Sequence, residues 1–268
     1  MTSEQPAPAP FVRTALALWV LGLVGVAMIS PYILEIEGPT LAAAAKSAHT
    51  TVDRLLIASL VQAGVLVGIC TFLGLWAARA VGLRTPVLSA LLTGQRLPRL
   101  GGPAAVSIVV GALSGLAILA LDAYVFRPGP KLSLVSSAPI EAWKGALASF
   151  YGGFTEELFL RLFLLSVIAV ALQALATGGK PRSRPLMPWA FWSANLVSAV
   201  VFGLGHLPAT EAVAPLTTLI LIRALVLNGL AGVACGALYW VWGLEFAMFA
   251  HFSADLVVHV AAPLIFGR

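Results

Sequence analysis

The stretch Thr155–Leu165 reads TEELFLRLFLL and places three charges inside a chain that is otherwise mostly apolar. Hydrophobic residues make up 60% of the 268 positions and charged residues 10%, whereas soluble domains carry roughly 25% charged residues. Several apolar runs reach the roughly 20 residues that a helix needs to cross a bilayer. Lipid leaves exposed backbone groups without partners, and these runs lack the alternation of barrel strands. The sequence therefore predicts an all-α, polytopic bundle of about seven to eight transmembrane helices.

Seven apolar runs are predicted to be the membrane-spanning segments. They are Thr14–Leu34, Leu55–Ala80, Ala104–Phe126, Gly145–Thr177, Pro188–His206, Pro215–Trp240 and Leu244–Ile265. The fourth run is too long for one perpendicular helix. A break is therefore predicted at Gly152 and Gly153, after a lead-in helix over Glu141–Tyr151. The Pro- and Ala-rich residues 1–10 are predicted to be disordered.

Basic residues account for the net charge of +5 and lie in short loops beside the apolar runs. This placement is typical of residues that set membrane topology, so no nucleic-acid partner is expected. With seven spans, the basic loops Arg79–Arg99 and Lys180–Arg184 fall on the same side of the membrane. The positive-inside tendency predicts that this side, together with the N-terminus, is cytoplasmic. The chain is interpreted as a multi-pass protein of a bacterial cell (inner) membrane.

Ionisable residues within the apolar runs point to function, because each costs on the order of 3 kcal/mol inside a membrane. They are Asp122, Glu156, Glu157, Arg161, His206, Arg223, His251, Asp255 and His259. Residues spaced four apart share one face of a helix. Three pairs have this spacing, namely Glu157 with Arg161, Phe202 with His206, and His251 with Asp255. Three helices therefore present polar faces that must turn toward one another or toward water.

The adjacent residues Glu156 and Glu157 point about 100° apart on a helix. One of them can pair with Arg161 while the other faces a cavity. Two close carboxylates in a poorly solvated site favour protonation of one of them, and a carboxylate tuned in this way can act as a general base. The alternative is a structural ion pair that locks the bundle, although a lock needs only one glutamate.

The histidines offer further polar groups. His206 is predicted at a helix end, where it is either catalytic or a satisfied structural residue, with Phe202 as a wall beside it. Asp255 can accept a hydrogen bond from His251 and favour its charged form, which is a good donor to a developing oxyanion. The alternative for this pair is a polar clasp between helices. His259 lies one turn further on and is predicted near the membrane interface.

The order of the three motifs carries more weight than any one of them. Glu-Glu-x-x-x-Arg, then Phe-x-x-x-His, then His-x-x-x-Asp, on three helices, resembles the CPBP family of CAAX-protease and bacteriocin-processing intramembrane proteases. The resemblance covers about Glu141–Phe266. It implies two parts, with N-terminal transmembrane helices over residues 1–140 and a CPBP-type catalytic helix bundle over residues 141–268. It also implies a glutamate-dependent endopeptidase that needs no metal and no cofactor.

The resemblance also assigns roles to residues of the first two motifs. Glu156 would be the base that activates a water molecule, helped by His206. Glu157 and Arg161 would hold the charge balance around that base. The substrate would be a membrane-embedded, membrane-associated or lipid-anchored protein or peptide, and the bilayer itself would be the other partner.

The third motif departs from the family pattern. The resemblance implies that His251 and position 255 stabilise the oxyanion of the tetrahedral intermediate. The family usually has Asn at the second position, whereas this chain has Asp255. An ionised Asp cannot donate a hydrogen bond. Either Asp255 is protonated, or it acts through His251, or the oxyanion site is weakened.

Two other classes of function stay open. A zinc-dependent membrane protease could use His206, His251, His259 and a glutamate, although the sequence lacks His-Glu-x-x-His. A non-catalytic protein is the other class: a transporter or proton-coupled channel could use Asp122, Arg223 and the glutamates as a proton relay, although no inverted repeat is visible, and a family member could bind or escort a partner without cutting it. The preferred interpretation of Asp122 and Arg223 is structural, with each needing a polar partner in the bundle.

Overall fold

The computed structural model describes residues 8–128, 132–134, 140–212 and 214–266, and its regular structure within these ranges is helical. The α-helices are α1 (Phe11–Met28), α2 (Ser30–Ser47), α3 (Val52–Val81), α4 (Pro86–Thr93), α5 (Gly101–Ala120), α6 (Ala142–Phe150), α7 (Ser166–Ala176), α8 (Pro188–Gly205), α9 (Leu207–Glu211), α10 (Thr218–Val241), α11 (Leu244–Leu256) and α12 (Ala262–Phe266). Four π-helical segments and one 3₁₀ turn join them, namely η1 (Leu121–Phe126), η2 (Tyr151–Glu156), η3 (Leu158–Leu165), η5 (Val257–Ala261) and η4 (Pro181–Ser183). The predicted all-α class is confirmed.

Seven helical segments in the described part of the chain are long and apolar enough to cross a membrane. They are Phe11–Met28, Val52–Val81, Gly101–Phe126, Ala142–Ala176, Pro188–Glu211, Thr218–Val241 and Leu244–Phe266. Each one overlaps a predicted span, so the polytopic helix bundle is confirmed with shifted boundaries. The predicted disorder of residues 1–10 falls mostly on residues 1–7, which lie outside the described ranges.

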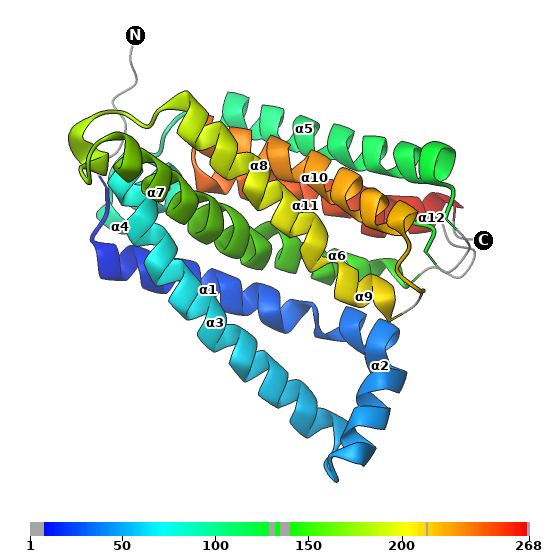
Figure 1. Ribbon diagram of the computed structural model, residues 1–268. Coiled ribbons are helices and arrows are strands. Elements are labelled where there is room, and N and C mark those ends of the chain that lie inside the picture. The colour runs from blue at the N-terminus through cyan, green and yellow to red at the C-terminus, as the bar shows by residue number, and fades with distance from the viewer. Residues whose placement is uncertain (1–7, 129–131, 135–139, 213, 267–268) are drawn as a thin grey trace.

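The first predicted span was too long at its C-terminal end. The helix α1 ends at Met28, and Ser30 begins a separate helix, α2, that carries Glu35 and Glu37. The sequence showed one continuous apolar run, so this change of direction was missed. In Figure 1, α2 and the first half of α3 form a hairpin that projects from the bundle.

The fourth predicted span contains no break at Gly152 and Gly153. The segment Ala142–Ala176 is continuous, but it changes to π-helical hydrogen bonding at Tyr151. Both glycines serve close packing instead, because a Cβ on Gly152 would overlap the Asp255 carboxylate and one on Gly153 would lie 3.0 Å from Phe252 Cβ. The π-helical turns flank the two glutamates, and such turns frequently mark functional sites.

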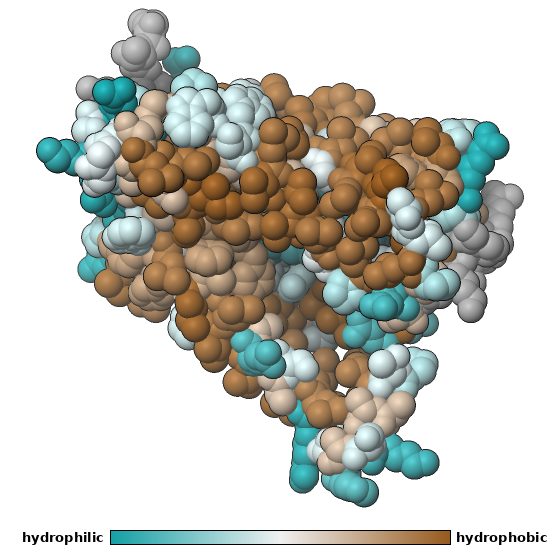
Figure 2. All heavy atoms as spheres, viewed as in Figure 1, coloured by the Kyte–Doolittle hydropathy of each residue, from teal (hydrophilic) through white to brown (hydrophobic). Residues whose placement is uncertain are grey.

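The helix α11 lies inside the bundle, where it packs against α5, α10 and η2 (Figure 1). Small residues allow this, because a Cβ on Gly111 of α5 would overlap the Ala250 carbonyl and one on Gly115 would lie 2.8 Å from the Ala254 carbonyl oxygen. Close approach through small residues is the usual device for packing helices in membranes. The outer surface of the long helices is largely hydrophobic (Figure 2), as expected for a multi-pass integral membrane protein.

The predicted structural role of Asp122 and Arg223 is supported by their contacts, because the two residues pair with each other. Asp122 is fully buried, and its Oδ1 accepts a hydrogen bond from Arg223 Nε at 2.6 Å. Asp122 Oδ2 accepts from the backbone N–H of Leu134 at 2.9 Å, and Arg223 Nη2 donates to the Leu132 carbonyl at 2.9 Å. This ion pair joins α10 to η1 and to the segment after it.

Candidate active site

Glu157 is the centre of a buried polar cluster formed by two membrane-spanning segments, Ala142–Ala176 and Leu244–Phe266. Its side chain is fully buried, and Oε1 lies 3.0 Å from Arg161 Nη1 and 2.7 Å from His251 Nδ1. Its second oxygen, Oε2, has no hydrogen-bond partner among the described residues. Arg161 balances the charge of the carboxylate and His251 donates to it, and such pairing is the condition for keeping an ion buried.

Arg161 connects this cluster to two more helices. The side chain is almost completely buried, and Nη2 donates to the Gly232 carbonyl of α10 at 3.2 Å. The guanidinium lies over the Phe202 ring of α8, at 5.1 Å from its centroid. Arg161 is therefore held by α8 and α10, and through it Glu157 is held as well.

Glu156 occupies a different environment from its neighbour. Its side chain is 22% exposed, whereas that of Glu157 is fully buried, and Glu156 Oε2 lies 3.5 Å from His251 Nε2. The expected pairing of one glutamate with Arg161 is made by Glu157, and the cavity expected beside the other glutamate stays a prediction. The site thus has one buried carboxylate fixed by Arg161 and His251 and one that is partly exposed.

His251 links the two glutamates. Its Nδ1 lies 2.7 Å from Glu157 Oε1, so this nitrogen carries the proton that an ionised carboxylate accepts. Its Nε2 faces Glu156 Oε2 at 3.5 Å and Asp255 Oδ1 at 3.8 Å. The expected hydrogen bond between His251 and Asp255 is absent at that distance. The short bond goes to Glu157 instead, because η2 and η3 bring that residue against α11.

His206 follows α8 and belongs to the same region through aromatic contacts. Its Nδ1 lies 2.9 Å from the Phe202 carbonyl oxygen, which can only accept, so the proton is on Nδ1. The Phe202 ring contacts the His206 ring at 4.9 Å between centroids and the His251 ring at 5.4 Å. Phe202 therefore separates the two histidines, and among the described contacts none joins His206 directly to Glu156.

Sequence reasoning missed two contributors. Gly152 leaves the space that the Asp255 carboxylate and the His251 ring occupy, but its sequence context suggested only a helix break. Tyr32 of α2 lies outside the predicted catalytic part, and its hydroxyl is 3.3 Å from His259 Nδ1. Burial, with a smaller effect of the Asp255 charge, raises the pKa of Tyr32 to about 12, so the hydroxyl stays protonated. His259 is thus bonded to α2 rather than to the cluster around Glu157.

A metal site was one of the alternatives. In the described part of the chain, one group has metal-ligand spacing, in which atoms of Glu157, Cys235 and His251 lie within 4.8 Å of one another. Of the three histidines considered as zinc ligands, only His251 belongs to this group. Arg161 already pairs with Glu157, and its charge opposes a second cation at the same oxygen.

The comparison with protein families adds an independent observation. Residues 138–257 match the family model described as type II CAAX prenyl endopeptidase, Rce1-like. This part of the chain is Rce1-like. The Rce1-like segment contains all six predicted site residues, and the match confirms the predicted relationship to the CPBP proteases. It supports a CAAX prenyl protease-like peptidase activity. No curated protein and no solved structure matches the chain.

Proposed function

We propose that the chain is an intramembrane endopeptidase in which Glu156 activates the water molecule that cleaves the peptide bond. The observation that carries the proposal is the difference between the two neighbouring glutamates. Glu157 is buried and fixed by Arg161 and His251, whereas Glu156 is 22% exposed beside His251 Nε2. A general base must reach the proton that it removes, and of the two glutamates only Glu156 combines partial exposure with a place in the cluster.

In the proposed reaction, Glu156 takes a proton from water while the water oxygen bonds to the carbonyl carbon of the substrate. The electron pair of the C=O bond moves to oxygen and gives a tetrahedral oxyanion. When the C–N bond breaks, Glu156 returns the proton to the leaving nitrogen. Glu156 therefore ends ionised, and the products are a carboxylic acid and an amine.

His251 is the proposed donor to the oxyanion. Its Nδ1–H is held by Glu157, so protonation of the imidazole places a second N–H on Nε2, between Glu156 and Asp255. A fixed donor aimed at developing charge is an effective source of transition-state stabilisation. Asp255 would stabilise this charged imidazole and would act on the reaction through His251.

His206 is the proposed second contact of the attacking water. Because its Nδ1–H donates to the Phe202 carbonyl, the neutral ring keeps Nε2 as an acceptor. This assignment lets Nε2 accept one hydrogen bond from a water molecule while Glu156 accepts the other. The role depends on the histidine lone pair, so a substitution with Gln tests it more sharply than one with Ala.

The proposed substrate is a lipidated or membrane-embedded peptide in a bacterial cell membrane. Two observations support this class, namely the location of the glutamates within a membrane-spanning segment and the CAAX prenyl endopeptidase match. Lipid attachment would concentrate a peptide at the bilayer and bring its chain to the depth of the site.

The direct test uses purified protein in liposomes with a fluorogenic peptide that ends in a prenylated cysteine motif. We expect cleavage by the wild type and by Glu37→Gln, which removes an acidic group of α2, but a loss of at least about 100-fold for Glu156→Gln. We also expect a chelator to leave the rate unchanged. Cleavage at the wild-type rate by Glu156→Gln would refute the proposal, and loss with a chelator that zinc restores would establish the zinc alternative.

A further inference from the structure

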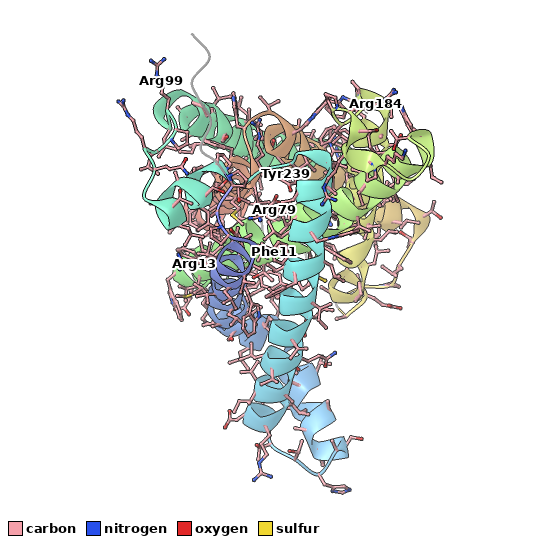
Figure 3. The ribbon with its side chains drawn as sticks, turned by 90° about the vertical axis from the view of Figure 1, so that its left-hand side faces the viewer. Phe11, Arg13, Arg79, Arg99, Arg184 and Tyr239 are labelled. Atoms are coloured by element: carbon pink, nitrogen blue, oxygen red, sulfur yellow. The ribbon has the colours of Figure 1, made fainter. Side chains whose placement is uncertain are left out.

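A second polar site lies at the end of the bundle where α3 ends, on elements that carry none of the six predicted catalytic residues. It is an open pocket of about 440 Å³. Its lining residues are Arg79, Ala80, Val81, Gly82, Arg182, Ser183, Arg184 and Pro185. Figure 3 views this end of the molecule, with Arg79 on α3 and Arg184 in the loop after α7.

The wall formed by α3 is fixed in place. Arg79 Nη2 donates to the Ala9 carbonyl at 2.6 Å and to Thr14 Oγ1 at 3.2 Å. The guanidinium also lies over the Phe11 ring, at 5.3 Å from its centroid. These contacts use one nitrogen and one face of the guanidinium, and they fix the side chain of this lining residue in place.

The wall formed by the loop after α7 is fixed by a buried amide. Gln173 is fully buried, and its Nε2 donates to the carbonyls of Arg184 at 3.3 Å and Pro185 at 3.0 Å. Its Oε1 accepts from the backbone N–H of Met187 at 3.1 Å. The arginine-bearing loop is therefore ordered before any ligand arrives, which lowers the entropic cost of binding.

The charge of the pocket is uncompensated within the described part of the chain. The lining contains three arginines and no acidic residue, and none of the three forms a described ion pair. Glu245, in the first turn of α11, is not among the lining residues, and its Oε1 accepts a hydrogen bond from the backbone N–H of Leu88 at 2.8 Å. Planar guanidinium groups match the oxygens of a phosphate group in pairs.

The surroundings favour a phosphate that belongs to a lipid. Trp76 lies one turn before Arg79 on α3 and is 56% exposed, and Leu175 near the end of α7 is 81% exposed. Exposed tryptophans gather at the head-group level of membranes, so apolar surface for acyl chains begins beside the arginines. We propose that this pocket binds the phosphate of an anionic lipid head group through Arg79, Arg182 and Arg184.

The test measures binding of phosphatidylglycerol, phosphatidylcholine and inorganic phosphate to the purified full chain by native mass spectrometry and titration. The variant carries Arg182→Gln and Arg184→Gln, which are exposed positions. The matched control carries Arg96→Gln and Arg99→Gln, which lie at the same end but outside the pocket lining. Thermal unfolding of both double variants in detergent verifies that they are folded.

We expect phosphatidylglycerol to bind more tightly than phosphatidylcholine, and the pocket variant to weaken that binding roughly tenfold or more. The control should stay within about twofold of the wild type. Equal losses in the two double variants would overturn the proposal, because general attraction to a basic surface would explain them. If inorganic phosphate binds as tightly as phosphatidylglycerol, the pocket binds a free anion and the assignment to a lipid is overturned.

Discussion

At the scale of single residues, the neighbouring side chains of Glu156 and Glu157 differ in burial and in the partners that they contact. Glu157 accepts from His251 and pairs with Arg161, and both oxygens are buried. Glu156 has one described ion-pair contact, to His251 Nε2 at 3.5 Å, and is partly open. The same functional group is therefore structural at one position and available for proton transfer at the next.

This difference predicts that the same substitution destabilises the protein at one position and hardly at the other. Glu157→Gln leaves Arg161 with an uncompensated buried charge, so we expect a loss of about 3–5 kcal/mol in the free energy of unfolding. Glu156→Gln should change that free energy by no more than about 0.5 kcal/mol. Thermal and denaturant unfolding in detergent measures both, and equal destabilisation by the two variants would contradict the assignment.

The departure at position 255 predicts that an amide is tolerated there. Asp255 Oδ1 lies 3.8 Å from His251 Nε2, so no short hydrogen bond is lost in Asp255→Asn. The amide can also donate to an oxyanion, which an ionised carboxylate cannot. This new donor would offset the loss of the charge that stabilises the His251 imidazolium, so we expect kcat/KM for peptide cleavage to be equal to or higher than that of the wild type. Complete loss of activity in a folded Asp255→Asn variant would show that the carboxylate itself is required.

At the scale of helices, the contact between α5 and α11 depends on glycines. Gly111 meets the Ala250 carbonyl with no space for a Cβ, whereas Gly102 on the same helix has nothing within 4 Å of its Cβ position. Gly111→Ala should therefore destabilise the bundle by about 1–3 kcal/mol through overpacking. Gly102→Ala should be neutral or stabilising, because Ala favours a helix by about 1 kcal/mol. Similar melting temperatures for the two variants would contradict this packing.

Periodicity predicted the helices and the faces that meet, but not their local geometry. The four-residue spacing of Glu157 and Arg161 placed both on one face, and their 3.0 Å ion pair follows from it. The spacing of His251 and Asp255 suggested a bond within α11, yet Glu157 from another helix is closer. Contacts between helices, the π-helical turns and the Tyr32 contact depend on tertiary packing, which spacing along one chain does not encode.

At the scale of the whole molecule, the two ends of the bundle differ in charge. Eight described basic residues belong to helix ends and loops at the end that carries α4 (Figure 1), namely Arg13, Arg79, Arg84, Arg96, Arg99, Lys180, Arg182 and Arg184. Four others, Lys46, Arg54, Arg127 and Lys144, belong to the opposite end. The acidic residues Glu35, Glu37, Asp53, Glu141 and Glu211 belong to the opposite end. The positive-inside tendency predicts that the end with α4 faces the cytoplasm.

This orientation predicts which engineered thiols a membrane-impermeant maleimide can reach. Ser47→Cys at the end of α2 should react in intact bacterial cells, whereas Ser183→Cys in η4 should react only after permeabilisation. Both serines are exposed, and the native residues Cys70 and Cys235 are buried, so background labelling should be low. The reverse pattern of labelling would invert the topology.

The measurement that tests the proposed protease activity most directly is a survey of new peptide termini in membranes. Cells expressing the wild type would be compared with cells expressing Glu156→Gln at equal abundance, with Glu37→Gln as the control. The proposal predicts termini that appear with the wild type and the control and are absent with Glu156→Gln, at cut sites that identify the substrate. Identical termini in all three membranes, with folded Glu156→Gln protein, would contradict the claim that Glu156 drives proteolysis.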